Sequence, residues 1–233
     1  AELYQKLAIN LNRGYGEYLK KMDEIISSYK EQGRRSEIQS ALKQLQWQVY
    51  ESPVSIPEDL CYLEGKYLED YLHDVDICQV FARRSREKMA EIILERTRMN
   101  GCDAFHTIHN YIDTDEMILR KGAIAAHKGK RVLIPINMKD GSILAIGKGN
   151  PEWNYSVPHG AGRIMSRTKA KNELNLDEYK QAMKGIYTTS ANENTLDEAP
   201  MAYKSQESII DVIRESVDII DVMKPTYNFK ASE

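Results

Sequence analysis

The sequence predicts a mixed α/β fold (α+β) in which a helical first part precedes a β-rich part that also contains helices. Residues 1–100 carry apolar side chains at intervals of three and four and contain few glycines and prolines, which is typical of amphipathic helices. Beyond Asn100, short runs of Val, Ile and Leu alternate with glycines, which favours strands and turns. Since no linker composition separates them, we expect residues 1–233 to form one domain portion, helical over 1–100 and β-rich over 101–233.

The helical part is divided by its breakers. We expect a helix from Ala1 to Tyr29, an interruption at Gly33, and a second helix over Ser36–Val49. Ser55 is placed to cap the next helix, with Pro57 in its first turn. Apolar residues with helical spacing predict that this long helix packs into the core: Leu68, Tyr71, Leu72, Val75, Cys78, Phe81, Met89, Ile92 and Ile93.

The β-rich part shows four short apolar runs and one clear turn. Lys139–Ser142 has the composition of a hairpin turn. Helices are expected near Ser190 and over Ser205–Met223, the latter ending before Pro225. The predicted strands are Met117–Leu119, Val132–Pro135, Ile143–Ile146, Ile186–Thr189 and, in the tail, Thr226–Lys230.

Composition excludes several classes of protein. With 42% hydrophobic residues and a net charge of −3, the chain is not expected to be disordered. Its apolar runs of three or four residues are far shorter than the ~18 that a membrane-spanning helix needs. Cys61, Cys78 and Cys102 are odd in number and form no Cys-x-x-Cys motif, so neither a disulfide framework nor a zinc ribbon is expected. We therefore expect a cytoplasmic protein without a membrane partner; the sequence starts at Ala1 without a signal peptide, which suggests a processed or truncated start.

Charge is distributed unevenly along the chain. Residues 117–171, termed the basic band, contain eleven Lys and Arg residues and only two acidic ones. Such a band inside an acidic protein favours a polyanion site, and a solvated basic surface is the alternative. Composition alone leaves both open.

Five histidines are candidates for chemistry. His73 and His127 are interpreted as surface residues. His106 and His109 lie three residues apart and would chelate one metal ion if their segment were helical; ordinary core or surface histidines are the alternative. His159 precedes Gly160-Ala161-Gly162, where glycines permit close backbone approach to a phosphate.

Arg163 and Arg167 follow this segment and would share a helix face that binds phosphate oxygens. Together with His159 they predict a nucleophile or general acid beside an anion pocket. A glycine turn around a buried histidine is the alternative.

These residues resemble the signature of the RtcB family of RNA-splicing ligases, and the resemblance extends over nearly the whole chain. The matching segments are Tyr62–Leu68, Asp70–Asp74, Ile108–Tyr111, Leu119–Ala123, Leu133–Pro135, His159–Arg167, Asp197–Lys204 and Lys224–Lys230.

The resemblance implies an RtcB-like fold and a GTP- and Mn²⁺-dependent RNA ligase that acts in tRNA splicing or RNA repair. Such an enzyme joins RNA ending in a 2′,3′-cyclic phosphate or 3′-phosphate to RNA with a 5′-hydroxyl. It passes through a covalent GMP intermediate on a histidine, which matches His159. RNA and GTP are the implied ligands, and an archease-type activator is an implied partner.

Site residues follow from the same matches. His109 matches a manganese ligand, and Asn110 a nucleotide contact. Lys230 matches a residue that reads guanine, and Tyr203 a residue that stacks on it. The other implied nucleotide-binding residues are Pro135, Ile136, Asn137, Met138 and Ser142 on one loop, and Gly160, Ala161 and Gly162 beside His159; Arg163 and Arg167 would bind the RNA backbone.

Two departures from the family pattern bear on activity. The nucleotide loop reads Pro135-Ile136-Asn137-Met138, where the family usually has Pro-Gly-Ser-Met. The family's upstream motifs, which carry most metal ligands, are absent, and Asp76-Ile-Cys78 has the wrong spacing to replace them. We therefore expect the C-terminal portion of a ligase, with an incomplete metal site and without activity on its own. A non-catalytic nucleotide- or RNA-binding fragment is the alternative, and an inert structural fragment is the third hypothesis.

Overall fold

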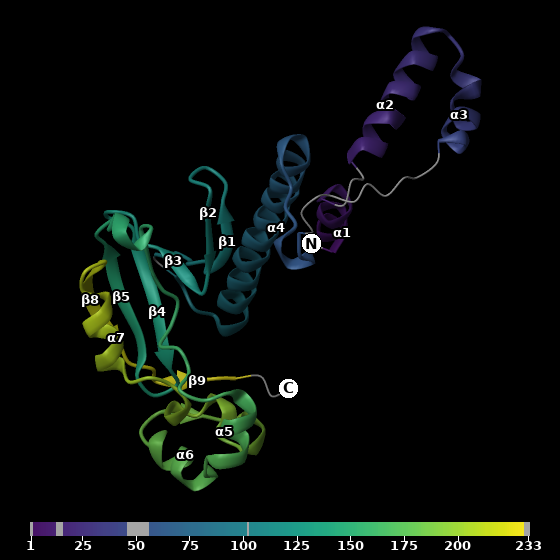
Figure 1. The fold of residues 1–233 in the computed structure, drawn as a ribbon. Helices are drawn as coiled ribbons and strands as arrows, with labels where there is room; N and C mark the ends of the chain where they lie inside the picture. The colour runs from purple at the N-terminus through teal and green to yellow at the C-terminus, as the bar shows by residue number, and fades with distance from the viewer. Residues whose placement is uncertain (1, 13–15, 46–55, 102, 231–233) are drawn as a thin grey trace. The chain divides into compact units, whose positions relative to one another are not determined.

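The computed structural model describes residues 2–12, 16–45, 56–101 and 103–230 and has the expected mixed α/β fold (Figure 1). The chain divides into two compact units, Ala1–Ser85 and Arg86–Glu233, and the division falls inside the long helix α4 (Gly65–Thr97). The first unit is helical, and the second contains all the described strands. Ser55, Val49 and Cys102, on which three of the sequence predictions rest, lie outside the described residues.

The first unit is built from short helices and the first part of α4. The stretch predicted as one helix over 1–29 corresponds to α1 (Glu2–Asn10) and α2 (Gly16–Glu31). A 3-10 turn, Arg35–Glu37, leads into α3 (Ile38–Gln44). The Tyr4 ring of α1 packs edge-on against Tyr71 at 5.1 Å between centroids, and its hydroxyl donates to Asp74 at 2.8 Å.

Two expectations for α4 were wrong. Pro57 does not start this helix, because it precedes a separate 3-10 turn, Glu58–Leu60, and α4 begins at Gly65. No residue of α4 is fully buried; the stripe is half-buried near Tyr71, whereas the Phe81 side chain is 74% exposed and Ile93 59% exposed. Helical periodicity predicts an apolar face but does not specify what covers it.

A three-stranded antiparallel sheet, β4–β5–β8, forms the core of the second unit. Strands β4 (Arg131–Asn137) and β5 (Gly141–Gly147) form the predicted hairpin, and β8 (Val217–Met223) pairs with β5. The helix α7 (Gln206–Ile213) lies along this sheet (Figure 1). Its Ile209 and Ile213 pack into the same apolar cluster as Val132, Ile134 and Ile143.

The helix predicted over Ser205–Met223 was therefore wrong in its second half. The chain leaves α7 after Ile213 and enters β8, which pairs along its length with β5. The segment Val217–Met223 is rich in Val and Ile, and its apolar spacing fits a helix as well as a strand. Pairing with β5 decides between them, because tertiary contacts override weak local preference. The helix expected near Ser190 is a 3-10 turn, Glu193–Glu198.

Shorter strand pairs and a small helical lobe complete this unit. The pairs β1–β2 and β3–β6 are antiparallel, and β7–β9 is parallel. In the lobe, Tyr179 is fully buried among Met138, Met183 and Leu196. The remaining bounds are β1 (Asn110–Asp113), β2 (Ile118–Lys121), β3 (Ala123–Ala125), β6 (Ser156–Pro158), α5 (Arg167–Glu173), α6 (Leu176–Ala182), β7 (Tyr187–Thr188), β9 (Tyr227–Asn228) and the 3-10 turns Pro151–Trp153 and Pro200–Ala202.

The five predicted strands each overlap a strand of the structure. Within the described residues, no helix has both the length and the apolar character needed to cross a membrane.

Candidate functional site

A cavity of about 760 Å³ in the second unit collects most of the residues singled out in the sequence. Its walls come from the tip of the β4–β5 hairpin, the segment after β6, the Glu193–Glu198 turn and the C-terminal tail. The predicted site residues that line it are Pro135, Ile136, Asn137, Met138, Ser142, His159, Gly160, Ala161, Gly162, Arg163, Arg167, Tyr203 and Lys230. His109 and Asn110 do not line the cavity.

His159 lies at the wall of this cavity, directly after β6. Its backbone N–H donates to the Gly122 carbonyl at 3.2 Å, and its ring stacks on the His109 ring with 4.4 Å between centroids and an interplanar angle of 9°. Gly122 leaves room for the ring, because a Cβ there would lie 3.3 Å from His159 Cδ2. Burial, together with the charge of His109, lowers the pKa of His159. The ring is therefore neutral at pH 7, as a nucleophile or metal ligand requires.

The segment that carries His106 and His109 is not helical, so the condition under which their spacing would chelate one metal ion is not met. His106 is exposed, whereas His109 faces His159. Asn110 contributes locally: its side-chain oxygen accepts from the Gly122 N–H at 3.0 Å. Among the described residues, no third His, Cys, Asp or Glu joins His109 and His159 in a set of three potential ligands. These residues therefore do not fit a complete manganese site.

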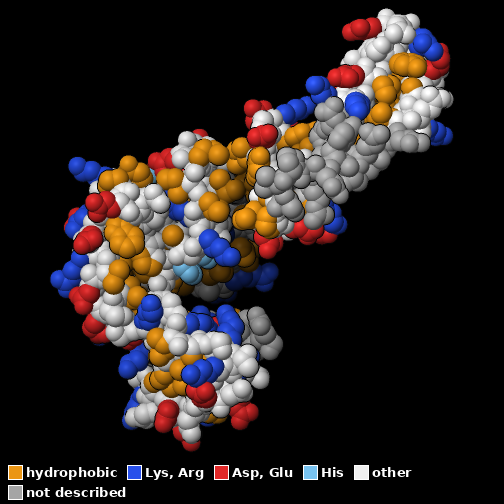
Figure 2. All heavy atoms as spheres, in the orientation of Figure 1, with side chains coloured by type: hydrophobic (Ala, Val, Ile, Leu, Met, Phe, Trp, Pro, Cys, Tyr) orange, Lys and Arg blue, Asp and Glu red, His pale blue; other side chains and the backbone are white. Residues whose placement is uncertain are grey.

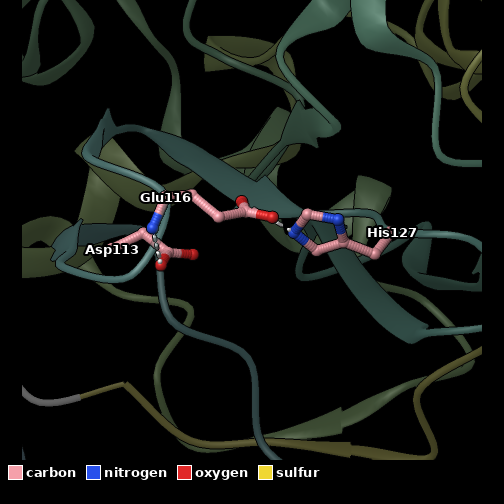
Figure 3. Close-up of side chains that lie close together, drawn as sticks. All are labelled: Asp113, Glu116 and His127. Atoms are coloured by element: carbon pink, nitrogen blue, oxygen red, sulfur yellow. Dashed lines mark hydrogen bonds and ion pairs between the residues drawn. The ribbon is translucent and has the colours of Figure 1, made fainter.

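A different group, Asp113, Glu116 and His127, has a spacing compatible with a metal ion (Figure 3). Its potential ligand atoms lie within 4.8 Å of one another, and His127 Nε2 is 3.2 Å from Glu116 Oε2. The buried guanidinium of Arg120 already lies 3.1 Å from Asp113 and 3.7 Å from Glu116. It also donates to Tyr111, 3.0 Å away. Arg120 thus serves as counter-ion to both carboxylates. Because its side chain is buried, it does not contribute to the exposed charge of the basic band.

The nucleotide loop expected at Pro135–Met138 and Ser142 is the end of the β4–β5 hairpin. Pro135 pairs with Ser142 across the strands. The Ile136 and Met138 side chains are buried. The Asn137 side chain accepts from the N–H groups of Lys139 and Asp140 and donates to the Asp140 carboxylate, all within 2.9 Å. The two residues that depart from the family pattern, Ile136 and Asn137, therefore serve the core and the turn.

The prediction that Arg163 and Arg167 share a helix face was wrong, because α5 starts only at Arg167, with Ser166 as its N-cap. They meet at two carboxylates instead. Arg167 donates to Asp197 at 2.6 Å, and both arginines donate to Glu198 Oε1, at 2.8 Å from Arg163 and 3.0 Å from Arg167. The Arg163 guanidinium also covers the Tyr203 ring at 4.7 Å. Arg163 is thus largely occupied within the protein, whereas Arg167 remains 62% exposed.

Glu198 is the acceptor on which the polar wall of the cavity converges. Besides the arginines, Tyr203 donates to its Oε2 at 2.8 Å, and Lys230 Nζ lies 3.4 Å away. Burial works to raise the pKa of Glu198, but the Tyr203 hydrogen bond and the charges of Lys230, Arg163 and Arg167 hold it below its ordinary value. Burial and Glu198 together raise the pKa of Tyr203 to about 12.

Sequence reasoning gave Glu198 no role. The available signal was an Asp-Glu pair in a segment that already matched the family, complementary in charge to the basic band. Other cavity residues without a predicted role are Met223, Lys224, Pro225 and Asn228.

Much of the basic band is neutralised by acidic residues outside it. Arg131 pairs with Asp103, and Lys148 lies 3.2 Å from Asp218. Four exposed lysines have no ion pair within the part of the chain that the structure describes: Lys121, Lys128, Lys130 and Lys139. Figure 2 shows Lys and Arg side chains (blue) beside histidine (pale blue), along the edge of a hollow in this unit.

The cavity thus brings an imidazole together with Arg and Lys side chains, which are the groups with which many proteins bind phosphates. The family model described as "tRNA-splicing ligase RtcB" matches residues 17–231, and the chain belongs to this family.

Curated relatives carry the same family name. The chain is 31% identical over 185 residues to the RNA-splicing ligase RtcB of Escherichia coli K12, which covers 71% of this chain and 45% of that protein. It is 40% identical over 89 residues to the tRNA-splicing ligase RtcB of Aeropyrum pernix, covering 36% of this chain and 18% of the relative. The chain thus spans about half the length of the Escherichia coli relative that it matches.

Proposed function

We propose that this chain carries the histidine-guanylylating centre of an RNA ligase that uses GTP to join RNA 3′-phosphate ends to 5′-hydroxyl ends. One observation supports the proposal above the others: His159, neutral and stacked on His109, lies at a cavity with the residues that match the nucleotide-binding positions of the family. The names of the relatives refer to RNA splicing, which supports RNA as the substrate.

The proposed ligation proceeds in three steps. A ring nitrogen of His159 attacks the α-phosphorus of GTP, so that an N–P bond forms, the bond to the β-phosphate oxygen breaks and pyrophosphate leaves. A 3′-phosphate oxygen of the RNA then attacks the same phosphorus, which breaks the N–P bond and restores the imidazole. Finally the 5′-hydroxyl oxygen of the second RNA attacks the activated RNA phosphate, GMP leaves, and the hydroxyl proton passes to solvent. A 2′,3′-cyclic phosphate end would first be opened by water.

The cavity residues have separable roles in this proposal. Lys230 and Tyr203, both held by Glu198, would bind the guanine base. Gly160, Ala161 and Gly162 would lie along the phosphates. Exposed Arg167 and the unpaired lysines of the basic band would hold the RNA backbone through salt-sensitive contacts. An archease-type activator and Mn²⁺ remain predictions from the resemblance, and a cytoplasmic location remains a prediction from the cysteine pattern.

Intact-mass spectrometry after incubation with GTP and Mn²⁺ tests the proposal directly. A gain of one GMP unit that is lost in His159→Ala would support the proposal and show that the first step needs no metal ligand beyond those of this chain. His106→Ala, which removes an exposed histidine, is the matched control and should label like the parent. An adduct that persists in His159→Ala would refute the assignment of the nucleophile.

A non-catalytic nucleotide-binding role is the second candidate. It is favoured by the nucleotide hairpin, where Asn137 is committed to the turn and Ile136 to the core. GTP binding in calorimetry without any covalent adduct would support this role over the ligase.

A further inference from the structure

Three aromatic side chains stand exposed where β7 pairs with the C-terminal tail. Tyr187 is 68% exposed, Tyr227 53% and Phe229 68%. The Tyr187 and Tyr227 rings are stacked, with 5.6 Å between centroids and an interplanar angle of 22°. We call Tyr187, Tyr227 and Phe229 the aromatic platform. Exposed aromatic clusters of this kind mark interaction surfaces rather than cores.

The tail that carries the platform is firmly placed. Tyr187 and Thr188 pair in parallel with Tyr227 and Asn228, and the Ser190 hydroxyl exchanges hydrogen bonds with the backbone of Lys230 at 2.8 and 3.1 Å. The Asn228 amide donates to the Met138 carbonyl at 2.6 Å. These bonds hold the backbone of the tail in place, so that a ligand stacking on the rings would not have to order the tail first.

The tail segment that carries Tyr227 and Phe229 also contributes residues to the cavity. Asn228 and Lys230 line the cavity that contains His159, and side chains in extended chain alternate between faces. Tyr227 and Phe229 therefore point away from the cavity. At about 3.3 Å per residue, the platform lies within roughly 10 Å along the chain from the cavity-lining Lys230.

The segments that carry the platform are rich in lysine, although Asp177, Glu178, Glu193 and Asp221 flank them directly. The two segments that form it, residues 179–192 and 222–230, contain four lysines and no Asp or Glu. These lysines are Lys180, Lys184 and Lys224, together with Lys230, which lines the cavity and lies 3.4 Å from Glu198. Exposed aromatic rings among cations are the combination with which proteins bind single-stranded nucleic acid, because bases stack on the rings while lysines contact the backbone.

A purely structural role explains less. Tyr187 and Tyr227 face each other in the register of the strand pair, and cross-strand aromatic pairs stabilise sheets. However, more than half of each of these side chains stays exposed, and Phe229 is as exposed as Tyr187. The pairing alone therefore does not account for the platform.

We propose that the aromatic platform of Tyr187, Tyr227 and Phe229 binds unpaired bases of a single-stranded RNA beside the His159 cavity. This inference rests on the proposed function, since it places the RNA strand that the ligase would act on.

The test is fluorescence anisotropy with a labelled single-stranded RNA decamer that ends in a 3′-phosphate. Tyr227→Leu combined with Phe229→Leu keeps apolar bulk and removes the ring faces. We expect this variant to bind the decamer at least about five-fold more weakly, since stacking on one ring contributes ~1–3 kcal/mol per base. Phe81→Leu is the matched control, because this 74% exposed ring lies outside both the platform and the basic band, and its RNA affinity should not change.

An abasic probe separates stacking from folding effects. With a decamer whose 3′ half is abasic, the platform variant and the parent should bind equally. GTP affinity, measured by calorimetry, should be the same in both proteins. Unchanged RNA affinity in the variant, an equal loss with intact and abasic RNA, or a parallel loss of GTP binding would each overturn the proposal.

The same experiment keeps this inference apart from the proposed function. If the parent chain binds RNA through the platform but forms no GMP adduct on His159, the ligase proposal fails and the platform stands. If the adduct forms but the platform variant binds RNA normally, only the platform fails.

Discussion

Glu198 offers the sharpest test of how the cavity wall is held together, through the substitution Glu198→Gln. Its carboxylate, 15% exposed, accepts from Arg163, which is 21% exposed, and from half-buried Tyr203. Hydrogen bonds that involve a charged group contribute about 1.5–3 kcal/mol each, and Gln retains one acceptor of the two. The contacts of Arg167 and Lys230 are discounted, because these side chains are 62% and 42% exposed and solvent screens them.

The expected cost of Glu198→Gln is therefore about 1–3 kcal/mol. For a chain of this size that corresponds to a fall in Tm of about 2–10 °C, measured by circular dichroism at pH 7. Glu193→Gln is the matched control, since Glu193 is exposed in the same 3-10 turn, and its Tm should stay within about 1 °C of the parent. Equal Tm values for the parent and Glu198→Gln would refute the reasoning that this carboxylate stabilises the cavity wall.

Acid should remove the difference between the two proteins. The folded-state pKa of Glu198 lies below its ordinary value of 4.5, so its contribution is fully present above about pH 4.5 and is lost as the pH falls through the folded-state pKa. Glu198→Gln lacks the titrating group. Unfolding free energies measured by urea titration should therefore converge below pH 4.5, and a constant difference down to pH 2 would contradict this account.

Three further substitutions test neighbouring features. Gly122→Ala should slow GMP adduct formation in the mass assay, because the new Cβ would lie 3.3 Å from the His159 ring and a side chain at a φ of +69° costs about 1–2 kcal/mol. An unchanged rate would show that the position of the ring does not depend on the space beside Gly122. Arg120→Met should lower the unfolding free energy by about 3 kcal/mol in urea titration, because it leaves the carboxylates of Asp113 and Glu116 without their buried counter-ion. The control Lys121→Met, at an exposed position, should change the unfolding free energy little, and equal effects of the two substitutions would argue against a buried ion network. Lys230→Met should raise the GTP concentration needed for half-maximal labelling of His159 without lowering the plateau, and an unchanged concentration would exclude Lys230 from base binding.

Local patterns in the sequence were sufficient for most of the strands and for the hairpin turn. The run Val132–Pro135 and the Lys139–Ser142 turn are specified by residues next to each other, and the structure confirms both. The segment Val217–Met223 failed because its spacing fits two structures, and only its partner β5 decides. The prediction that the α4 stripe packs into the core was wrong for a related reason. Helical spacing places Phe81 on an apolar face, but it does not specify which element packs against that face.

The candidate site divides in the same way. His159 and its glycines were visible as a motif, because the residues are adjacent in the sequence. Glu198 was not, because its importance comes from four donors that lie 5, 31, 32 and 35 residues away along the chain and meet only in the fold. Arg163 and Arg167 were assigned to RNA from their charge, and the structure shows that charge already engaged.

This engagement changes what the basic band can do. An RNA phosphate that binds Arg163 would have to displace a carboxylate at 2.8 Å, whereas one that binds the exposed lysines displaces only water and counter-ions. The affinity for RNA should therefore come from the unpaired lysines, from exposed Arg167 and from stacking, and Arg163 should serve the shape of the cavity. Because each phosphate contact weakens RNA binding as salt is raised, replacing unpaired Lys130 should reduce the salt dependence of RNA binding, and replacing Arg163 should mainly reduce the stability of the fold.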